Sequence, residues 1–374
     1  MDILELKNDL IQYSKTIGID KIGFTTASPF DELKNRLIRQ LELHYQSGFE
    51  EPDIDKRTNP NLLLDGAQSI ISIAVAYPSK MTNRVVSKNG ERRGIFSRAS
   101  WGMDYHIVLR ERLKKLEAYI KEKVPGALCK SMVDTGELAD RAVAERAGIG
   151  WSGKNCAIIT PEFGSYVYLG EMITNLPFEP DIPMEDQCGT CNKCIEACPT
   201  GALVQGGQIN AQHCISFLTQ TKGMIAEEFR NKIGNRLYGC DSCQTACPVN
   251  KGKDFHLHQE VEPEPEIAKP LLRPILQLSN RQFKEKFGHV SGAWRGKNPI
   301  QRNAMIALAH FKDESALEDL VDLLNHDSRP MIRATAAWAI RMIAGKESEA
   351  ILEEALKVES DDTVKAEIEK VLNQ

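Results

Sequence analysis

The sequence predicts a multidomain protein of the α+β class, with an α/β domain first, a cysteine-rich segment second and helical repeats last. Three observations predict this order. Strand-like and helix-like stretches alternate in the first half, eight of the ten cysteines fall within residues 188–248, and residues 299–374 have helical periodicity. A chain of 374 residues is long enough for two or three domains.

The first domain is predicted from the period of its apolar residues. Ser69–Tyr77 is rich in β-branched residues, as a buried strand would be. The alternation of such strands with amphipathic helices favours a layered α/β domain that ends near residue 177. Helices are predicted over 2–17, 29–47 and 104–123 and after Thr135-Gly136, and strands over Lys21–Thr26, 69–77, 127–133, 156–159 and 166–174.

The composition is that of a soluble globular protein with a net charge of −5. The acids of Met1-Asp2-Ile3-Leu4-Glu5 interrupt every apolar run at the N-terminus, so neither a signal peptide nor a membrane span is predicted there. Ten cysteines without a secretion signal indicate a reducing compartment, and we expect a cytoplasmic location.

The first cysteine motif is Cys188-Gly-Thr-Cys191-Asn-Lys-Cys194-Ile-Glu-Ala-Cys198-Pro199. This is the complete C-x2-C-x2-C-x3-C-P run of bacterial two-cluster ferredoxins, in which the first three thiolates bind one 4Fe–4S cluster and the fourth binds the other. The sequence therefore predicts a ferredoxin-like segment.

The second motif, Cys240-Asp-Ser-Cys243-Gln-Thr-Ala-Cys247-Pro248, matches the same run except at its start, where Leu237 replaces a cysteine. Cys214 is the only unassigned cysteine of the segment, so we assign it as the missing ligand. The crossed scheme then gives two ligand sets: Cys188, Cys191, Cys194 and Cys247 for one cluster, and Cys198, Cys214, Cys240 and Cys243 for the other.

Zinc and disulfides are the alternatives for these cysteines. Three cysteines at three-residue spacing fit tetrahedral zinc poorly, and disulfides conflict with a reducing compartment. Two adjacent clusters indicate electron transfer, since a structural role would need only one.

The C-terminal helices repeat at about 32 residues, a period typical of stacked helix pairs. Ala304, Ala307 and Leu308 align with Ala336, Ala339 and Ile340, and then with Ile368, Val371 and Leu372. The pattern resembles HEAT repeats.

Longer motifs carry a family resemblance. The run Val133-Asp134-Thr135-Gly136-Glu137-Leu138-Ala139-Asp140-Arg141-Ala142, its continuation through Ala147–Asn155, the Arg57-x-Asn59-Pro60 motif and both cysteine motifs are similar to epoxyqueuosine reductase. The resemblance implies reduction of the epoxide of epoxyqueuosine, at the wobble position of tRNA, to the alkene of queuosine. It also implies base-off cobalamin, which receives electrons from two 4Fe–4S clusters, and a relation to reductive dehalogenases.

The sequence has no complete cobalamin motif of its own. Asp104-Tyr105-His106 begins the familiar Asp-x-His-x-x-Gly pattern, but Leu109 replaces the glycine, so we interpret the match as chance. For Ile158 and Leu169 plain core packing is the alternative. The expected cobalamin contacts are Arg57, Tyr105, Asp134, Asn155, Ile158, Leu169, Ser216 and Phe217.

Asp134 has two interpretations. Asp134-x-x-Glu137 has the form of a capping box, which favours a helix N-cap. The resemblance instead implies that Asp134 is the catalytic proton donor, and as a buried acid it would need a raised pKa to stay protonated.

A basic stretch indicates contact with RNA. Residues 269–303 hold eight Lys and Arg residues and one acid, Glu285, inside an acidic protein. A solvated linker is the alternative. The expected tRNA contacts are Lys222, Arg281, Trp294, Arg295, Lys297 and Arg302.

We therefore expect four parts: a cobalamin-binding catalytic domain over 1–177, a two-cluster domain over 178–255, a linker with the basic segment over 256–298 and HEAT-like repeats over 299–374. The expected partners are tRNA and an external electron donor, with flavodoxin or ferredoxin as candidates, and no membrane; a monomer is expected. Two other functions remain open, a dehalogenase-like reductase of a small molecule and a ferredoxin-type electron carrier.

Overall fold

The computed structural model describes residues 2–373. They form two compact units, each assembled from three separate stretches of the chain. The first unit comprises 1–80, 103–214 and 241–262, and the second comprises 81–102, 215–240 and 263–374. The four-part division expected from the sequence therefore stays a prediction.

The first unit is organised around a four-stranded sheet in the order β1-β2-β7-β4, with every neighbouring pair antiparallel. All eight residues of β2 are buried, as expected of a central strand. The alternation of strands and helices does not reveal the antiparallel pairing. The strands are β1 (Lys21–Thr26), β2 (Ser69–Ala76), β4 (Cys129–Met132) and β7 (Val167–Thr174), with short pairs β5 (Trp151–Ser152) with β6 (Ile158–Ile159) and β8 (Leu203–Gln205) with β9 (Gln208–Ile209).

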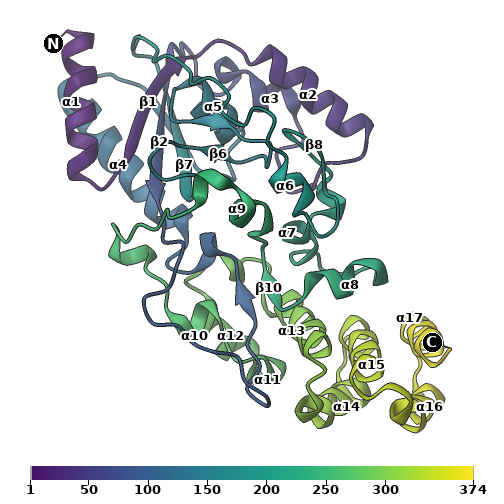
Figure 1. The fold of residues 1–374 in the computed structure, drawn as a ribbon. Coiled ribbons are helices and arrows are strands. Elements are labelled where there is room, and N and C mark those ends of the chain that lie inside the picture. The colour runs from purple at the N-terminus through teal and green to yellow at the C-terminus, as the bar shows by residue number, and fades with distance from the viewer. Residues whose placement is uncertain (1, 374) are drawn as a thin grey trace. The chain divides into compact units, whose positions relative to one another are not determined.

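Helices cover both faces of this sheet (Figure 1). On one face, α4 packs against β7 and β4, with α1 beside it. On the other face, α5 packs against β2 and β7, where Ala74, Ala144 and Ile149 share a buried cluster. The helices of this unit are α1 (Ile3–Thr16), α2 (Asp31–Glu42), α3 (Ile54–Thr58), α4 (Tyr105–Lys123), α5 (Asp140–Arg146), α6 (Lys193–Glu196) and α9 (Ser242–Ala246).

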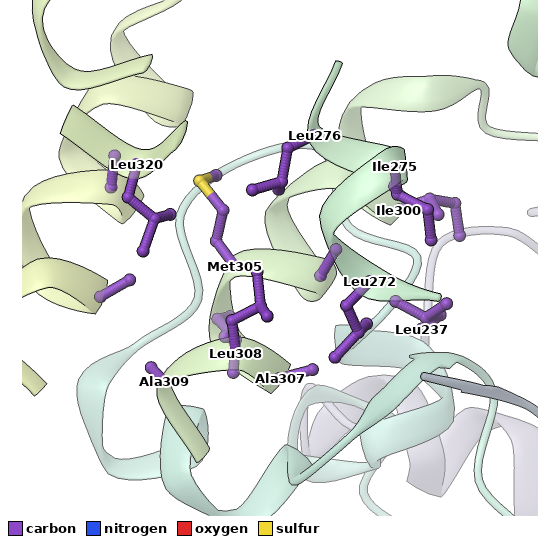
Figure 2. Packing of buried hydrophobic residues seen from close by; sticks show 14 of the residues in the cluster. Leu237, Leu272, Ile275, Leu276, Ile300, Met305, Ala307, Leu308, Ala309 and Leu320 are labelled. Atoms are coloured by element: carbon purple, nitrogen blue, oxygen red, sulfur yellow. The ribbon is translucent and has the colours of Figure 1, made fainter. Parts of the chain in front are cut away.

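The second unit is mainly helical. In its core, Leu237 of β10 packs in one buried cluster with residues of the first C-terminal helices. Among these residues are Leu272, Ile300 and Leu308 (Figure 2). The elements are β3 (Ile95–Phe96), α7 (Ile215–Leu218), α8 (Glu227–Ile233), β10 (Arg236–Tyr238), α10 (Pro265–Ala268), α11 (Leu272–Leu276), α12 (Asn280–Phe287), α13 (Lys297–Phe311), α14 (Leu317–His326), α15 (Pro330–Ala344), α16 (Glu349–Val358) and α17 (Asp362–Leu372).

The predicted repeat is confirmed. Helices α13, α15 and α17 begin at residues 297, 330 and 362, and α15 packs against both of the others. The residues aligned from the sequence lie on their buried faces, with Ala304, Ala336 and Ile368 each at 0% exposure. No helix of the described residues is long and apolar enough to cross a membrane.

Candidate functional site

Four cysteines from two distant motifs line one cavity of about 190 Å³. Cys188, Cys191 and Cys194 come from the loop and helix at α6, and Cys247 ends α9. The helices α6 and α9 pack together, which brings residue 247 beside the first motif. This grouping is the first ligand set of the crossed scheme.

The other four cysteines come from stretches that belong to different units. Cys198, Cys214 and Cys243 belong to the first unit, and Cys240 is the last residue of a stretch of the second. The backbone N–H of Ala202 donates to Cys198 Sγ at 3.2 Å, a bond that suits a thiolate ligand. Within residues 2–373, no group of three or more His, Cys, Asp and Glu is arranged to hold a single metal ion.

Leu237, which replaces the expected cysteine, has a structural role. It is 0% exposed in β10 and packs in the core of the second unit (Figure 2). Its Cδ1 lies 2.5 Å from the position that a Cβ on Gly94 would take. This position is packed as apolar core, so the side chain there is not presented as a ligand.

Asp134 lies in the loop between β4 and α5. Its backbone is left-handed, with φ of +51°, and its N–H donates to Asp140 Oδ2 at 2.8 Å. The capping-box interpretation is wrong, because α5 begins six residues later and its N-cap residue is Ala139. The side chain of Asp134 is 58% exposed and is therefore accessible to a reactant.

Two residues of the first turn of α4 hold the Asp134 carboxylate. The Tyr105 hydroxyl donates to Asp134 Oδ2 at 2.7 Å, and His106 Nε2 lies 3.3 Å from the same oxygen as an ion-pair contact without hydrogen-bond alignment. Asp104, the N-cap of α4, binds the other ring nitrogen of His106 at 2.7 Å. Tyr105 also stacks on Tyr168 of β7 at 5.0 Å between ring centroids.

These contacts decide where a proton resides. Burial alone would raise the pKa of Asp134, but the ion-pair contact with His106 and the hydrogen bond from Tyr105 outweigh it and lower that pKa. Burial alone would lower the pKa of His106, but Asp104 and Asp134 raise it to about 9. Asp134 therefore lacks the raised pKa that a donor protonated at rest would need, and near neutral pH the pair carries its proton on His106.

His106 is a candidate site residue that the sequence did not predict. The Asp104-x-His106 pattern at the start of a helix could have indicated this histidine. An aspartate that caps a helix can also bind the imidazole ring two residues later, as Asp104 does here.

The remaining residues predicted to contact cobalamin are spread over both units. Asn155 is 6% exposed and lines the four-cysteine cavity, and its Nδ2 is buried without a hydrogen-bond partner. Ile158 is 3% exposed and packs with Leu169 in an apolar cluster, so their packing role is evident. Arg57, in α3, is half-buried, while Ser216 and Phe217 lie on α7 of the second unit.

The residues predicted to contact RNA lie in the second unit and differ in accessibility. Lys222 and Arg281 are exposed. Trp294 is 50% exposed and donates to Gln220 Oε1 at 2.8 Å, with the Arg295 guanidinium 4.7 Å from its ring centroid. Lys297 is partly buried and donates to the Leu278 carbonyl at 2.8 Å.

The prediction that Arg302 contacts RNA is wrong. Arg302 is 0% exposed, and its guanidinium donates to the carbonyls of Leu218, Thr219, Thr221 and Gly223. Burial lowers its pKa to about 9. The guanidinium holds the end of α7 and the segment that follows it through these backbone carbonyls. The positive charge of Arg302 therefore serves the fold and is not available to RNA.

Comparison with known proteins gives three matching family models. They are described as epoxyqueuosine reductase QueG, DUF1730, over residues 57–135, as a 4Fe-4S double cluster binding domain over residues 187–250, and as HEAT repeats over residues 297–373. The second range contains all eight cysteines of the predicted ligand sets.

Individual proteins match along the whole chain. The epoxyqueuosine reductase of Bacillus anthracis is 67% identical over 372 residues, which cover 100% of this chain and 98% of that protein. A solved structure of epoxyqueuosine reductase with an epoxyqueuosine-modified tRNA-Tyr stem loop is 66% identical, with a TM-score of 0.98 and coverage of 100% of this chain and 99% of that one.

A Bacillus subtilis epoxyqueuosine reductase, described with "the Asp134 catalytic loop swung out of the active site", has 66% identity, a TM-score of 0.97 and the same coverage. Identity at this level over the full length settles the family. The chain belongs to the epoxyqueuosine reductases.

Proposed function

We propose that this protein reduces the epoxide of epoxyqueuosine, at the wobble position of tRNA, to the alkene of queuosine. The observation that carries the proposal is the accessible Asp134 carboxylate, held by Tyr105 and His106 in the same unit as the four-cysteine cavity. A proton donor and an electron path are the two components that this reaction requires.

The stoichiometry defines what the side chains must do. Conversion of an epoxide to an alkene breaks two C–O bonds and releases the oxygen as water, which consumes two electrons and two protons. Since an alkoxide is a poor leaving group, the oxygen must be protonated as it departs. Asp134 is the proposed donor to this oxygen; His106 supplies the first proton through the contact at Oδ2, and the second is taken up from solvent by the same pair.

Two 4Fe–4S clusters would supply the electrons. Cys188, Cys191, Cys194 and Cys247 would bind the first, and Cys198, Cys214, Cys240 and Cys243 the second. The buried, unpartnered Nδ2 of Asn155 suits an acceptor in the neighbouring cavity, such as a cluster sulfur or an amide of a cofactor.

Base-off cobalamin is the proposed acceptor for these electrons, and when bound it would supply a low-potential cobalt centre. The residues of the first unit that would hold it are Arg57, Tyr105 and Asn155, with apolar contacts from Ile158 and Leu169. His106 is committed to Asp104 and Asp134, which supports a site without a histidine ligand to cobalt.

Transfer RNA is the proposed substrate carrier, bound through the exposed cations Lys222 and Arg281 and the Trp294–Arg295 pair.

The 4Fe–4S clusters would be reduced one electron at a time by an external protein donor of low potential. Flavodoxin or ferredoxin would be suitable. We propose that the protein acts as a monomer.

The proposal is tested by anaerobic incubation of the reconstituted protein with a reductant and a stem loop that carries epoxyqueuosine. Nucleoside mass spectrometry should show the loss of one oxygen atom from the modified base. An unchanged base, with both clusters and cobalamin bound and the stem loop bound, would contradict the proposal.

A further inference from the structure

A pair of buried carboxyl groups lies beneath the Asp134 loop. Asp140 begins α5, and Glu171 lies on the face of β7 that α5 covers. Glu171 is 0% exposed, and its carboxyl interacts with that of Asp140. Among residues 2–373, neither oxygen of Glu171 has a hydrogen-bond partner.

No cation contacts Glu171 among the described residues for which ion pairs are given. Its cross-strand neighbours are Ser72 on β2 and Met132 on β4, and the Ser72 hydroxyl is also buried without a partner. An ionised carboxylate without a cation is too costly to bury, so Glu171 is held as the neutral acid. Burial and the neighbouring Asp140 and Asp134 raise its pKa well above the usual value, in agreement with this assignment.

A neutral Glu171 has one O–H to donate and places no second negative charge beside the Asp140 carboxyl. The Asp140 carboxyl has its Oδ2 turned toward the loop. That oxygen accepts the Asp134 N–H at 2.8 Å. The charged groups that face Asp140 are Asp134, Glu171 and, from α3, Arg57.

The backbone of Asp134 needs such a support. A left-handed backbone at φ of +51° is less favourable than a right-handed one even for aspartate, which tolerates it better than most residues, so a hydrogen bond from the N–H stabilises the turn. The left-handed turn is what directs the Asp134 side chain to Tyr105 and His106 on α4. If the bond to Asp140 were lost, the loop would be free to relax to an ordinary conformation.

We propose that Asp140 is a positioning residue for the reaction, because its carboxyl holds the Asp134 backbone in the left-handed turn, with the buried acid Glu171 beside it. Neither group touches the substrate in this account. The inference rests on the proposed function for its catalytic consequence, but its structural part concerns only the Asp134 loop.

The test compares Asp140→Ala, Asp140→Asn and the wild type in the cofactor-loaded protein. Asp140→Ala removes the acceptor, whereas Asn keeps an oxygen that can accept the Asp134 N–H and an amide that can meet Glu171. Asp361→Ala is the matched control, because Asp361 likewise accepts backbone N–H groups at the start of a helix, α17.

Hydrogen exchange of a peptide that covers residues 133–139 gives the first readout. We expect exchange at least about tenfold faster in Asp140→Ala, the scale of one lost bond to a charged acceptor, and within about twofold of wild type in Asp140→Asn. Turnover of the stem loop gives the second readout: kcat should fall in Asp140→Ala with KM unchanged, and Asn should restore it. Asp361→Ala should change neither readout.

Unchanged exchange in Asp140→Ala would overturn the inference, as would an Asn variant that exchanges as fast as the Ala variant. These results are separable from failure of the proposed function. Suppose the wild type does not turn over the tRNA stem loop, but Asp140→Ala still speeds hydrogen exchange of the Asp134 loop. The proposed function is then refuted, and the positioning role of Asp140 stands.

Discussion

Replacement of His106 by Asn is the perturbation that tests the proton pair most sharply. The rise in the pKa of His106 from 6.5 to about 9 corresponds to a net stabilisation of the imidazolium of about 3 kcal/mol, in which the contacts with Asp104 and Asp134 outweigh the cost of burial. Asp134 is more than half exposed, so solvent screening limits its contribution to about 1 kcal/mol. Asp104 therefore contributes more than Asp134 to the stabilisation of the imidazolium.

The sign of the pH dependence follows from this rise. A histidine with a raised pKa keeps its proton, and the interactions that depend on it, until the pH passes the raised value. We expect wild-type turnover to be maintained to about pH 9 and to fall above it. In His106→Asn the donor is Asp134 alone, whose ordinary pKa is about 4, so turnover should already decline with pH in the acidic range.

The assay is turnover of the epoxyqueuosine stem loop under anaerobic conditions at pH 5.5, 7 and 8.5. We expect a loss of about 100-fold for His106→Asn at pH 8.5, the scale of a lost general acid, and a smaller loss at pH 5.5. His326→Asn is the matched control, because His326 also pairs with a carboxylate, Asp322 at 3.0 Å on α14, and it should have no effect. An unchanged pH profile in His106→Asn would refute the reasoning.

Three further predictions concern Asp134, Glu171 and the RNA surface. Asp134→Ala should keep both clusters and the affinity for the stem loop but lose about 100-fold or more in kcat, and full turnover would contradict its role. Because Glu171 has a raised pKa, the free energy of unfolding should fall as pH rises above about 4.5, and Glu171→Gln should flatten this slope in urea unfolding at pH 5 and 8. Lys222→Glu should weaken stem-loop binding and reduce its salt dependence, while Arg302→Ala should lower the melting temperature; a salt-independent affinity in the wild type would refute the RNA surface.

Much of the fold could be predicted from local pattern. The strand predicted over Lys21–Thr26 has the bounds of β1, and the predicted helix over 104–123 differs from α4 by one residue. The repeat was visible because small and branched apolar residues recur on one helical face. The antiparallel order of the sheet was not predicted, because it depends on which strands pair over long separations in sequence.

Site residues could be predicted where cluster binding requires cysteines at fixed spacing along the chain. They could not be predicted where their role depends on contacts between residues far apart in the sequence. Cysteine spacing grouped Cys188 with Cys247 across more than fifty residues, and the structure places both at one cavity. Sequence could not show that Arg302 is an internal cation, because its partners are backbone carbonyls that carry no sequence signal. For the same reason the link between Asp140 and the Asp134 backbone was invisible before the fold was known.

The central claim, that this chain couples electron transfer to removal of the epoxide oxygen, is tested most directly by stoichiometry. A measured amount of one-electron reductant is added anaerobically to the loaded protein with excess stem loop, and queuosine is counted by mass spectrometry. The account predicts two electrons consumed and one oxygen atom lost for each modified base. Consumption of reductant without oxygen loss, or opening of the epoxide with the oxygen retained, would contradict it.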